Sequence, residues 1–387
     1  MLELNRRNLF KLTATLAGTF MAGKTLSTTA MAAEANFTPS EKTPLLLNFN
    51  ENSLGMAQSA KQAVLKSLDG AFRYPDAARA QLIEAIAKKF ALKSSQVVLG
   101  NGSSEVIQAA VEAFSHKAQK ARQAVQLIVP DPTFNYAELY ASAIGIEVVK
   151  VPLVKESLAL DLVQMKSKAQ AFKGLSIVYI CNPNNPTATI ADAKVLSDWF
   201  NQKSTHTVFI VDEAYAEFVT DKSFRSAVEN VKAGSNHIVV TRTFSKIYAM
   251  AGLRIGYGLT DERTAKLLND FVSIDNTNTA GAVAALASLN DDLFFEKSLQ
   301  STNLARKIVT DALDELGLKY LPSQANFIFH EIKGEHQTYK DRMAKAHVFV
   351  GREFAPDVGY NRMTLGTPQE MRAFVEVLKS FRQKGWI

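Results

Sequence analysis

The stretch VVTRTFSKIYAMAGLRIGYGL, residues 239–259, shows how this chain is organised. It begins with an apolar, β-branched run of the kind that forms a strand covered on both faces. The run stops at a turn rich in hydroxyl groups, which contains the single lysine Lys246, and Arg254 follows eight residues later. A buried strand that ends in such side chains predicts a binding site beyond the carboxyl end of a sheet.

The same short apolar pattern recurs along the first two thirds of the chain, and stretches with helical spacing lie between several of the runs. The strand-like segments are 96–100, 125–130, 146–153, 175–181, 207–215 and 237–242. This alternation predicts an α/β fold with a large doubly wound, mostly parallel sheet. Beyond residue 261, two long helices are expected at 261–277 and 292–317, followed by strand-like runs and a final helix.

We therefore expect a large domain and a smaller α+β domain. The predicted parts are an export signal at 1–32, an N-terminal arm packing on the small domain at 33–70, the large domain at 71–275 and the small domain at 276–387. A chain of 387 residues with 47% hydrophobic and 21% charged residues is long enough for two such cores.

The net charge of +6 gives no indication of a nucleic-acid partner. Residues 1–32 contain four basic residues and one acidic residue, so +3 of that charge belongs to this segment and +3 remains for the rest. Cys181 is the only cysteine, which excludes an intramolecular disulfide. No metal site is expected either.

The N-terminus has the order of an export signal: paired arginines, an apolar stretch from Leu12 to Ala22, and small residues at 30–32. The run RRNLFK resembles the twin-arginine type, although Asn5 stands where Ser or Thr is commoner. We therefore expect a periplasmic or otherwise exported protein, and a cytoplasmic one if the signal is not used. A membrane anchor or a disordered basic tail is the alternative. The apolar stretch is too short to span a bilayer.

Polar or aromatic side chains follow the predicted strands. Ser103 and Ser104 begin a helix after Gly102, which suits a phosphate cradle but equally a plain helix cap. Phe134 follows the next strand, where its ring could stack on a flat ligand or join the core. Asn185 lies in a loop with two Asn-Pro steps, which would aim its amide into the cleft or form a simple turn.

A carboxylate ends the next strand. Asp212 follows an apolar run and needs a cationic or hydrogen-bonding partner unless the strand end is solvated, and Tyr215 could place a phenol nearby. These groups together suit one small molecule, pyridoxal 5'-phosphate. Lys246 would form a Schiff base with its aldehyde, and Asp212 would pair with its ring nitrogen. Thr243, Ser245 and Arg254 would hold its phosphate.

Several blocks of the chain resemble a known family, the fold-type I aminotransferases, and in particular its histidinol-phosphate aminotransferase branch. The resemblance runs from 48 to 370. Its blocks, in order, are NFNENSLGM, FRYPD, GNGSSEVI, PDPTFNYAE, NPNNPT, VDEAYAEF, RTFSKIYAMAGLRIGYG, NFIF and NRMTLGTPQE. The resemblance implies an aminotransferase that moves an amino group between an L-amino acid, or an amine like histidinol phosphate, and a 2-oxo acid.

The resemblance also implies roles for individual residues. It implies that Asp212 pairs with the ring nitrogen of the cofactor and that Phe134 stacks on the ring. Asn185 and Tyr215 would contact the ring's phenolic oxygen. The residues implied around the phosphate are Ser103, Ser104, Thr243, Ser245 and Arg254.

Further implied roles concern the substrate and a second subunit. Arg362 matches the arginine that binds the substrate's α-carboxylate, a task suited to its bidentate fork. Arg352 would support it, and Asn52 would border the substrate. Tyr74 resembles the tyrosine that reaches the phosphate of a neighbouring subunit, which implies a homodimer with shared active sites.

Two departures from the family are Ala188, where Gly usually follows NPT, and Ser104, where many relatives have Asp. The substrate stays open. Histidine biosynthesis is a cytoplasmic task, so an exported relative is expected to serve another amino acid.

The expected reaction requires Lys246 to act as a base. We therefore predict a lowered pKa for its amine, caused by Arg254, the cofactor's positive ring and partial burial. A decarboxylase or lyase on the same fold is one alternative, and a non-catalytic periplasmic binding protein is another. A dinucleotide-dependent dehydrogenase is disfavoured because no G-x-G-x-x-G follows a first strand.

Overall fold

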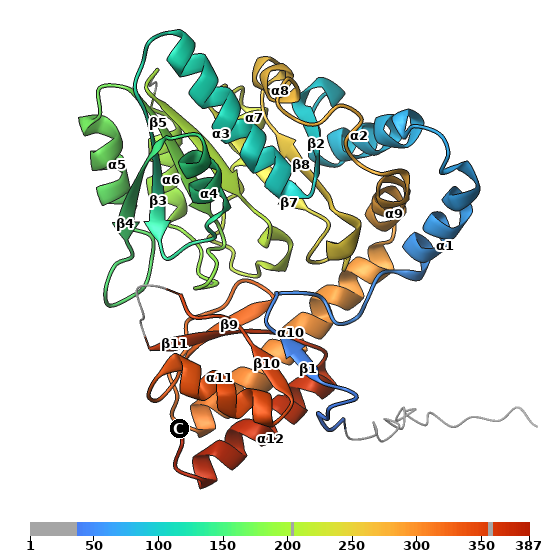
Figure 1. Cartoon of the computed structure of the whole chain (residues 1–387), viewed down its shortest axis with the longest axis vertical. Coiled ribbons are helices and arrows are strands. Elements are labelled where there is room, and N and C mark those ends of the chain that lie inside the picture. Colours follow the sequence, from blue (N-terminus) through green and yellow to red (C-terminus); the bar gives the residue numbers. More distant parts are fainter. Residues whose placement is uncertain (1–36, 203–204, 355–358) are drawn as a thin grey trace, which may run out of the picture. The chain divides into compact units, whose positions relative to one another are not determined.

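A seven-stranded sheet forms the centre of the larger of two lobes (Figure 1) in this computed structural model, which describes residues 37–202, 205–354 and 359–387. The strand order is β2-β8-β7-β6-β5-β3-β4. The strands are β2 (Val97–Asn101), β3 (Val125–Asp131), β4 (Glu147–Pro152), β5 (Leu175–Cys181), β6 (Thr207–Asp212), β7 (Ile238–Thr243) and β8 (Ile255–Leu259). Every pairing is parallel except the two that β8 makes, with β2 and with β7, so the prediction of a doubly wound, mostly parallel sheet is confirmed.

Helices cover both faces of this sheet, which explains why its strands are apolar on both sides. The first face carries α3 (Ser103–Lys120), α4 (Tyr136–Ala143) and α8 (Glu262–Asn269). The second carries α2 (Asp76–Phe90), α5 (Leu162–Ala171), α6 (Ala193–Phe200), α7 (Val228–Lys232) and α9 (Thr279–Leu289). In β5, Ile177 and Tyr179 join the first core while Val178 and Ile180 join the second.

Strand β8 was not predicted. Its sequence IGYGL is short and holds two glycines, which weaken a strand signal. The structure explains why one of these positions is a glycine. A Cβ on Gly256 would overlap the backbone of Ser103, so the glycine lets β8 pack directly against the start of α3.

The prediction of one helix over 261–277 was wrong, because α8 ends at Asn269. The chain after α8 forms a loop that is hydrogen-bonded to β2 and α3. The Asn276 amide donates to the Leu99 carbonyl and to the Glu105 carboxylate, both at 2.9 Å. Helix α9 then follows, and it was missed because its small residues, TAGAVAALASL, show no polar face.

The smaller lobe is built from two strand pairs and three helices. β9 (Phe327–Glu331) pairs antiparallel with β11 (Tyr360–Thr364), and β1 (Leu45–Leu47) pairs in parallel with β10 (Val348–Val350). α11 (His336–Lys345), α12 (Pro368–Gln383) and the second half of α10 (Asp292–Glu315) pack around them. The first half of α10 packs on the large-lobe core, so this helix joins the lobes (Figure 1).

The N-terminal arm is shared between the lobes. β1 belongs to the smaller lobe, whereas α1 (Gln58–Ser67) packs against α9 and the residues around Ala60 join the large-lobe core. Short 3₁₀ turns occur at Leu68–Gly70, Ser94–Gln96, Ala216–Phe218 and Ala251–Leu253.

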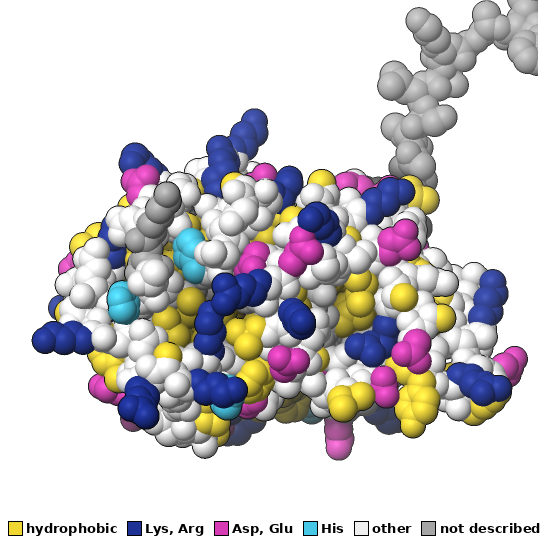
Figure 2. Space-filling model, turned by 90° about the horizontal axis from the view of Figure 1, so that it is seen from above, with side chains coloured by type: hydrophobic (Ala, Val, Ile, Leu, Met, Phe, Trp, Pro, Cys, Tyr) yellow, Lys and Arg dark blue, Asp and Glu magenta, His cyan; other side chains and the backbone are white. Residues whose placement is uncertain are grey.

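The predicted export signal at 1–32 lies outside the described residues. In the part of the chain that the structure describes, no helix combines the length and apolar character needed to cross a bilayer. Figure 2 shows basic, acidic and hydrophobic side chains interspersed over the face seen from above.

Candidate active site

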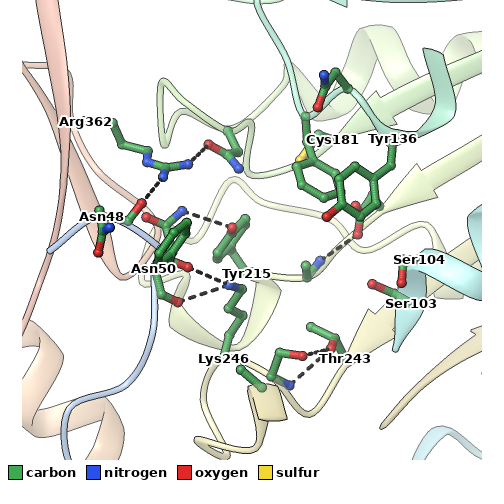
Figure 3. Close-up of a pocket in the computed structure, with 18 of the residues that line it drawn as sticks. Asn48, Asn50, Ser103, Ser104, Tyr136, Cys181, Tyr215, Thr243, Lys246 and Arg362 are labelled. Carbon is green, nitrogen blue, oxygen red and sulfur yellow. Dashed lines mark hydrogen bonds between the residues drawn. The ribbon is translucent and has the colours of Figure 1, made fainter. Parts of the chain in front are cut away.

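A cavity of about 490 Å³ lies beyond the carboxyl ends of the parallel strands, with walls from both lobes (Figure 3). Most of the predicted site residues line it: Ser103, Ser104, Phe134, Asn185, Asp212, Tyr215, Thr243, Ser245, Lys246, Arg254, Arg352 and Arg362. Segments far apart in the sequence thus meet where the topology of an α/β sheet predicts a ligand site.

Lys246 follows β7 and extends into the cavity, half-buried. Its Nζ donates hydrogen bonds to the carbonyls of Asn50 at 3.1 Å and Phe49 at 3.3 Å (Figure 3). Burial lowers the pKa of its amine to about 8, helped by the positive charge of Arg362 and, more weakly, of Arg254. The predicted direction is confirmed, although Arg362 rather than Arg254 is the stronger neighbour.

Asp212, at the end of β6, is 2% exposed, so it is not a solvated strand end. Its carboxylate accepts hydrogen bonds from the Tyr179 hydroxyl at 2.9 Å, the Thr241 hydroxyl at 3.1 Å and the Ala214 amide at 3.2 Å. Burial raises the pKa of this carboxyl, and these hydrogen bonds and the charge of Lys246 oppose that rise. Asp212 is therefore a fixed, buried acceptor.

The start of α3 forms a cup for an anion. Gly102 precedes the helix with φ 78° and ψ 165°, a conformation that is essentially restricted to glycine. A Cβ there would overlap the guanidinium of Arg254, which donates to the Ser104 hydroxyl at 3.2 Å. Opposite them, the Thr243 hydroxyl donates to Ser245 Oγ at 2.8 Å. Amides at a helix start, hydroxyls and one arginine suit a phosphate.

An aromatic ring and a phenol also line the cavity. The half-buried ring of Phe134 lies 4.3 Å from that of Tyr136, at 34° to it. The hydroxyl of Tyr215 accepts a hydrogen bond from the Asn50 amide at 3.1 Å, and burial raises the pKa of that phenol. The phenol is therefore held in its neutral, donor-competent form.

Arg362 extends from β11 and is nearly buried. Its guanidinium donates to Asn185 Oδ1 at 2.8 Å and to the Asn48 carbonyl at 2.6 Å, while its Nε is buried with no hydrogen-bond partner among the described residues. Burial lowers its pKa to about 10, and the nearby charge of Arg352 adds to this effect. Arg352 itself lies over the Phe354 ring, 4.2 Å from its centroid.

Two predicted residues do not line the cavity. Asn52 is not among the lining residues: its amide donates to the Ile247 carbonyl at 3.0 Å and to Ser298 Oγ at 2.5 Å, and these bonds hold the arm in place. Asn50, in the same sequence block, faces the cavity instead. Tyr74 is 78% exposed and lies outside the cavity in this single chain.

The sequence reasoning also missed lining residues. They are Asn48, Phe49, Asn50, Asn135, Tyr136, Cys181, Ala214, Ala251, Lys340, Val350 and Phe354. The alternation of polar residues in NFNEN carried a signal for Asn48 and Asn50, which share the spacing of Asn52. Nothing in the sequence around Lys340 marks it as a site residue.

These residues fit pyridoxal 5'-phosphate. The cup at Gly102 leaves room that any side chain would fill, Asp212 offers a buried carboxylate for a ring nitrogen, and Lys246 has the lowered pKa that condensation with an aldehyde requires. Phe134 and Tyr215 provide the stacking surface and the phenol.

Comparison with known proteins agrees with this chemistry. The family model described as aminotransferase class I and II matches residues 42–378. Histidinol-phosphate aminotransferase from Moorella thermoacetica is 33% identical over 340 residues, covering 87% of this chain and 85% of that protein. Histidinol-phosphate aminotransferase 2 from Pasteurella multocida is 32% identical, covering 85% and 87%.

Solved structures show the same similarity. A structure from Erwinia carotovora atroseptica, named provisionally as a histidinol-phosphate aminotransferase, is 40% identical with a TM-score of 0.87, covering 91% of this chain and all of that one. The enzyme from Sinorhizobium meliloti, solved in complex with pyridoxal 5'-phosphate, has a TM-score of 0.76 at 22% identity, covering 87% and 91%, and supports the fold alone. Because the family model spans most of the chain and the cavity has the matching chemistry, the protein belongs to the class I and II aminotransferases and is a pyridoxal-phosphate-dependent, histidinol-phosphate aminotransferase-like enzyme.

Proposed function

We propose that this enzyme transfers the amino group of an L-amino acid, or of an amine like histidinol phosphate, to a 2-oxo acid, with Lys246 as the proton-transferring residue. One observation supports this most: Lys246, with a pKa of about 8, shares a cavity with the buried Asp212 and with Arg362. The names of the similar enzymes support an anionic amine as the donor.

When bound, pyridoxal phosphate supplies an aldehyde that condenses with amines and a ring that withdraws electrons from the neighbouring carbon. The chain's own residues do the rest. Lys246 Nζ needs its neutral form to accept a proton, and its lowered pKa provides that form near neutral pH. The carbonyls of Phe49 and Asn50 accept hydrogen bonds from this amine and so fix its orientation.

Binding and orientation fall to the other side chains. Asp212 keeps its carboxylate in place through three donors, so a positive ring nitrogen would meet a fixed partner. Arg362 has the planar fork that matches a carboxylate, and it lines the cavity.

The test is an assay of the purified enzyme, loaded with cofactor, on a panel of amino donors with 2-oxoglutarate. A new 2-oxo acid together with glutamate supports transfer. Carbon dioxide without glutamate would instead support the decarboxylase alternative, and binding without any product would support a non-catalytic protein. The Lys246→Ala variant serves as the control and should yield no product.

A homodimer forms part of this proposal. Besides Tyr74, which is 78% exposed, other large apolar side chains are exposed: Phe72 at 78%, Leu65 at 67% and Ile274 at 93%. A second copy of the chain would cover such a surface. Light scattering should give twice the chain mass, and Phe72→Asp should reduce it. A monomer at micromolar concentration would contradict the proposal.

Export of the enzyme is a separate proposal. It rests on residues 1–32 alone, with paired arginines, an apolar stretch and small residues in signal order. Cell fractionation should find a shortened chain outside the cytosol, and Arg6→Lys with Arg7→Lys should retain it inside. Full-length protein found only in the cytosol would contradict export.

A further inference from the structure

The third residue of α3, at the phosphate cup, is a glutamate. Glu105 directly follows Ser104, is half-buried and does not line the cavity. By charge alone an acid is unfavourable at this place, because a carboxylate repels an anion that binds nearby. Its hydrogen bonds give another reason for its presence.

The Glu105 carboxylate joins two segments that are far apart in the sequence. Its Oε2 accepts the backbone amide of Asn101 at 2.6 Å and the side-chain amide of Asn276 at 2.9 Å. Its Oε1 accepts the backbone amide of Ser273 at 3.1 Å. A glutamate in the third position of a helix commonly bonds to the capping residue, which here is Gly102. Glu105 instead binds the residue before that glycine.

Asn101 connects this carboxylate to the cup. Its carbonyl accepts a hydrogen bond from the Arg254 guanidinium at 3.3 Å, and its Oδ1 accepts one from the Thr277 amide at 3.3 Å. The backbone amide, the backbone carbonyl and the side chain of Asn101 are therefore all engaged. A shift of Asn101 would move the backbone that leads into Gly102 and, with it, an acceptor of Arg254.

The loop that Glu105 binds has an unfavourable backbone conformation. Asp275 and Thr277 have φ of 55° and 75°, in the left-handed region that costs free energy for residues other than glycine. Asn276 lies between them, is 4% exposed and also donates to the Leu99 carbonyl. Such a conformation persists only where surrounding contacts fix it. Glu105 supplies two of these contacts, through Asn276 and the Ser273 amide.

We propose that Glu105 is a positioning residue for the phosphate of the cofactor. It ties the loop at 273–277 to Asn101 and so fixes the backbone and the arginine that form the cup. This inference rests on the pyridoxal-phosphate-dependent function proposed above and deepens it. The charge of Glu105 opposes anion binding and its hydrogen bonds favour it, and the effect of the hydrogen bonds is the larger.

The test compares pyridoxal 5'-phosphate with pyridoxal in absorbance titrations of the cofactor-free enzyme. The two ligands share the ring and the aldehyde and differ in the phosphate. Glu105→Gln keeps the size of the side chain but replaces one acceptor oxygen by an amide group, which cannot accept from Asn101 or the loop. The variant should bind pyridoxal 5'-phosphate about tenfold more weakly and pyridoxal with unchanged affinity.

Glu112→Gln is the matched control. Glu112 lies on the same helix, accepts the Gln108 amide at 2.9 Å and does not line the cavity, so both ligands should bind this variant as they bind the parent. Asn276→Ala removes the link from the loop side and should give the same selective loss as Glu105→Gln. The double variant should be about as weak as the weaker single one, because the two residues form one link.

Tighter binding of pyridoxal 5'-phosphate by Glu105→Gln, as its charge alone predicts, would overturn the inference. An unchanged affinity, or an equal loss for both ligands, would overturn it as well. If Glu105→Gln does not fold, Asn276→Ala decides by the same comparison. Amino transfer by the parent enzyme without a selective loss in these variants would leave the proposed function standing without this role for Glu105. A selective loss in an enzyme that transfers no amino group would do the reverse.

Discussion

Replacing Gly102 by alanine tests whether the start of α3 forms the phosphate cup. The backbone there has φ 78° and ψ 165°, and a residue with a Cβ pays about 1–3 kcal/mol in that region. The added methyl group would also overlap the guanidinium of Arg254 and push it from the cup. Losing one charge-assisted hydrogen bond to a phosphate costs about 1.5–3 kcal/mol, so cofactor affinity should fall about 10- to 150-fold.

Gly145→Ala is the matched control. Gly145 also has a positive φ, +73°, but a Cβ there meets nothing within 4 Å. Both variants should unfold at a lower temperature than the parent, as scanning calorimetry of the cofactor-free proteins would show. Only Gly102→Ala should weaken pyridoxal phosphate binding in a fluorescence titration. Equal dissociation constants in the two variants would refute the assignment of the cup.

Three further predictions concern Lys246 and Arg362. Lys246→Ala should abolish turnover and prevent borohydride from fixing the cofactor to the chain, and wild-type activity in this variant would remove the lysine from the mechanism. Because burial lowers the pKa of Lys246 to about 8, cofactor loading of the empty enzyme should accelerate about tenfold from pH 7 to pH 9 and then level off as the amine becomes fully neutral. A rate still climbing tenfold per unit above pH 9 would indicate an ordinary lysine. Arg362→Lys should raise the KM for a carboxylate-bearing donor about 10- to 100-fold, because an ammonium lacks the planar guanidinium that spans Asn185 and Asn48. An unchanged KM would show that the substrate carboxylate binds elsewhere.

Much of the large lobe could be predicted from the sequence because its strands are buried on both faces. β5 is buried along its whole length, so its seven apolar or small residues give an unbroken signal. The same logic located Lys246 and Asp212, which are polar groups placed directly after such runs. The helix break after Asn269 could not be predicted, since it depends on Asn276 bonding to groups more than 170 residues away in the sequence.

The substrate end of the cavity was predicted less well, and the reasons are physical. Asn50 and Asn52 are equivalent in sequence pattern, and the bonds from Asn52 to Ile247 and to Ser298 on α10 decide which of them turns away. Lys340 lies on an amphipathic helix where a lysine is ordinary. Its place in the cavity follows from the packing of α11 in the smaller lobe, which no local pattern encodes.

The three residues of β1 have a mechanical consequence. They anchor the chain to β10 in the smaller lobe, and within three residues the same backbone offers Lys246 the carbonyls of Phe49 and Asn50. Arg362 lies on β11 of that lobe and donates a hydrogen bond to the Asn48 carbonyl. A tilt of the smaller lobe would therefore move the carbonyls that accept from Lys246 and the guanidinium of Arg362 together. Ligand binding by Arg362 would in this way be coupled to the orientation of the Lys246 amine.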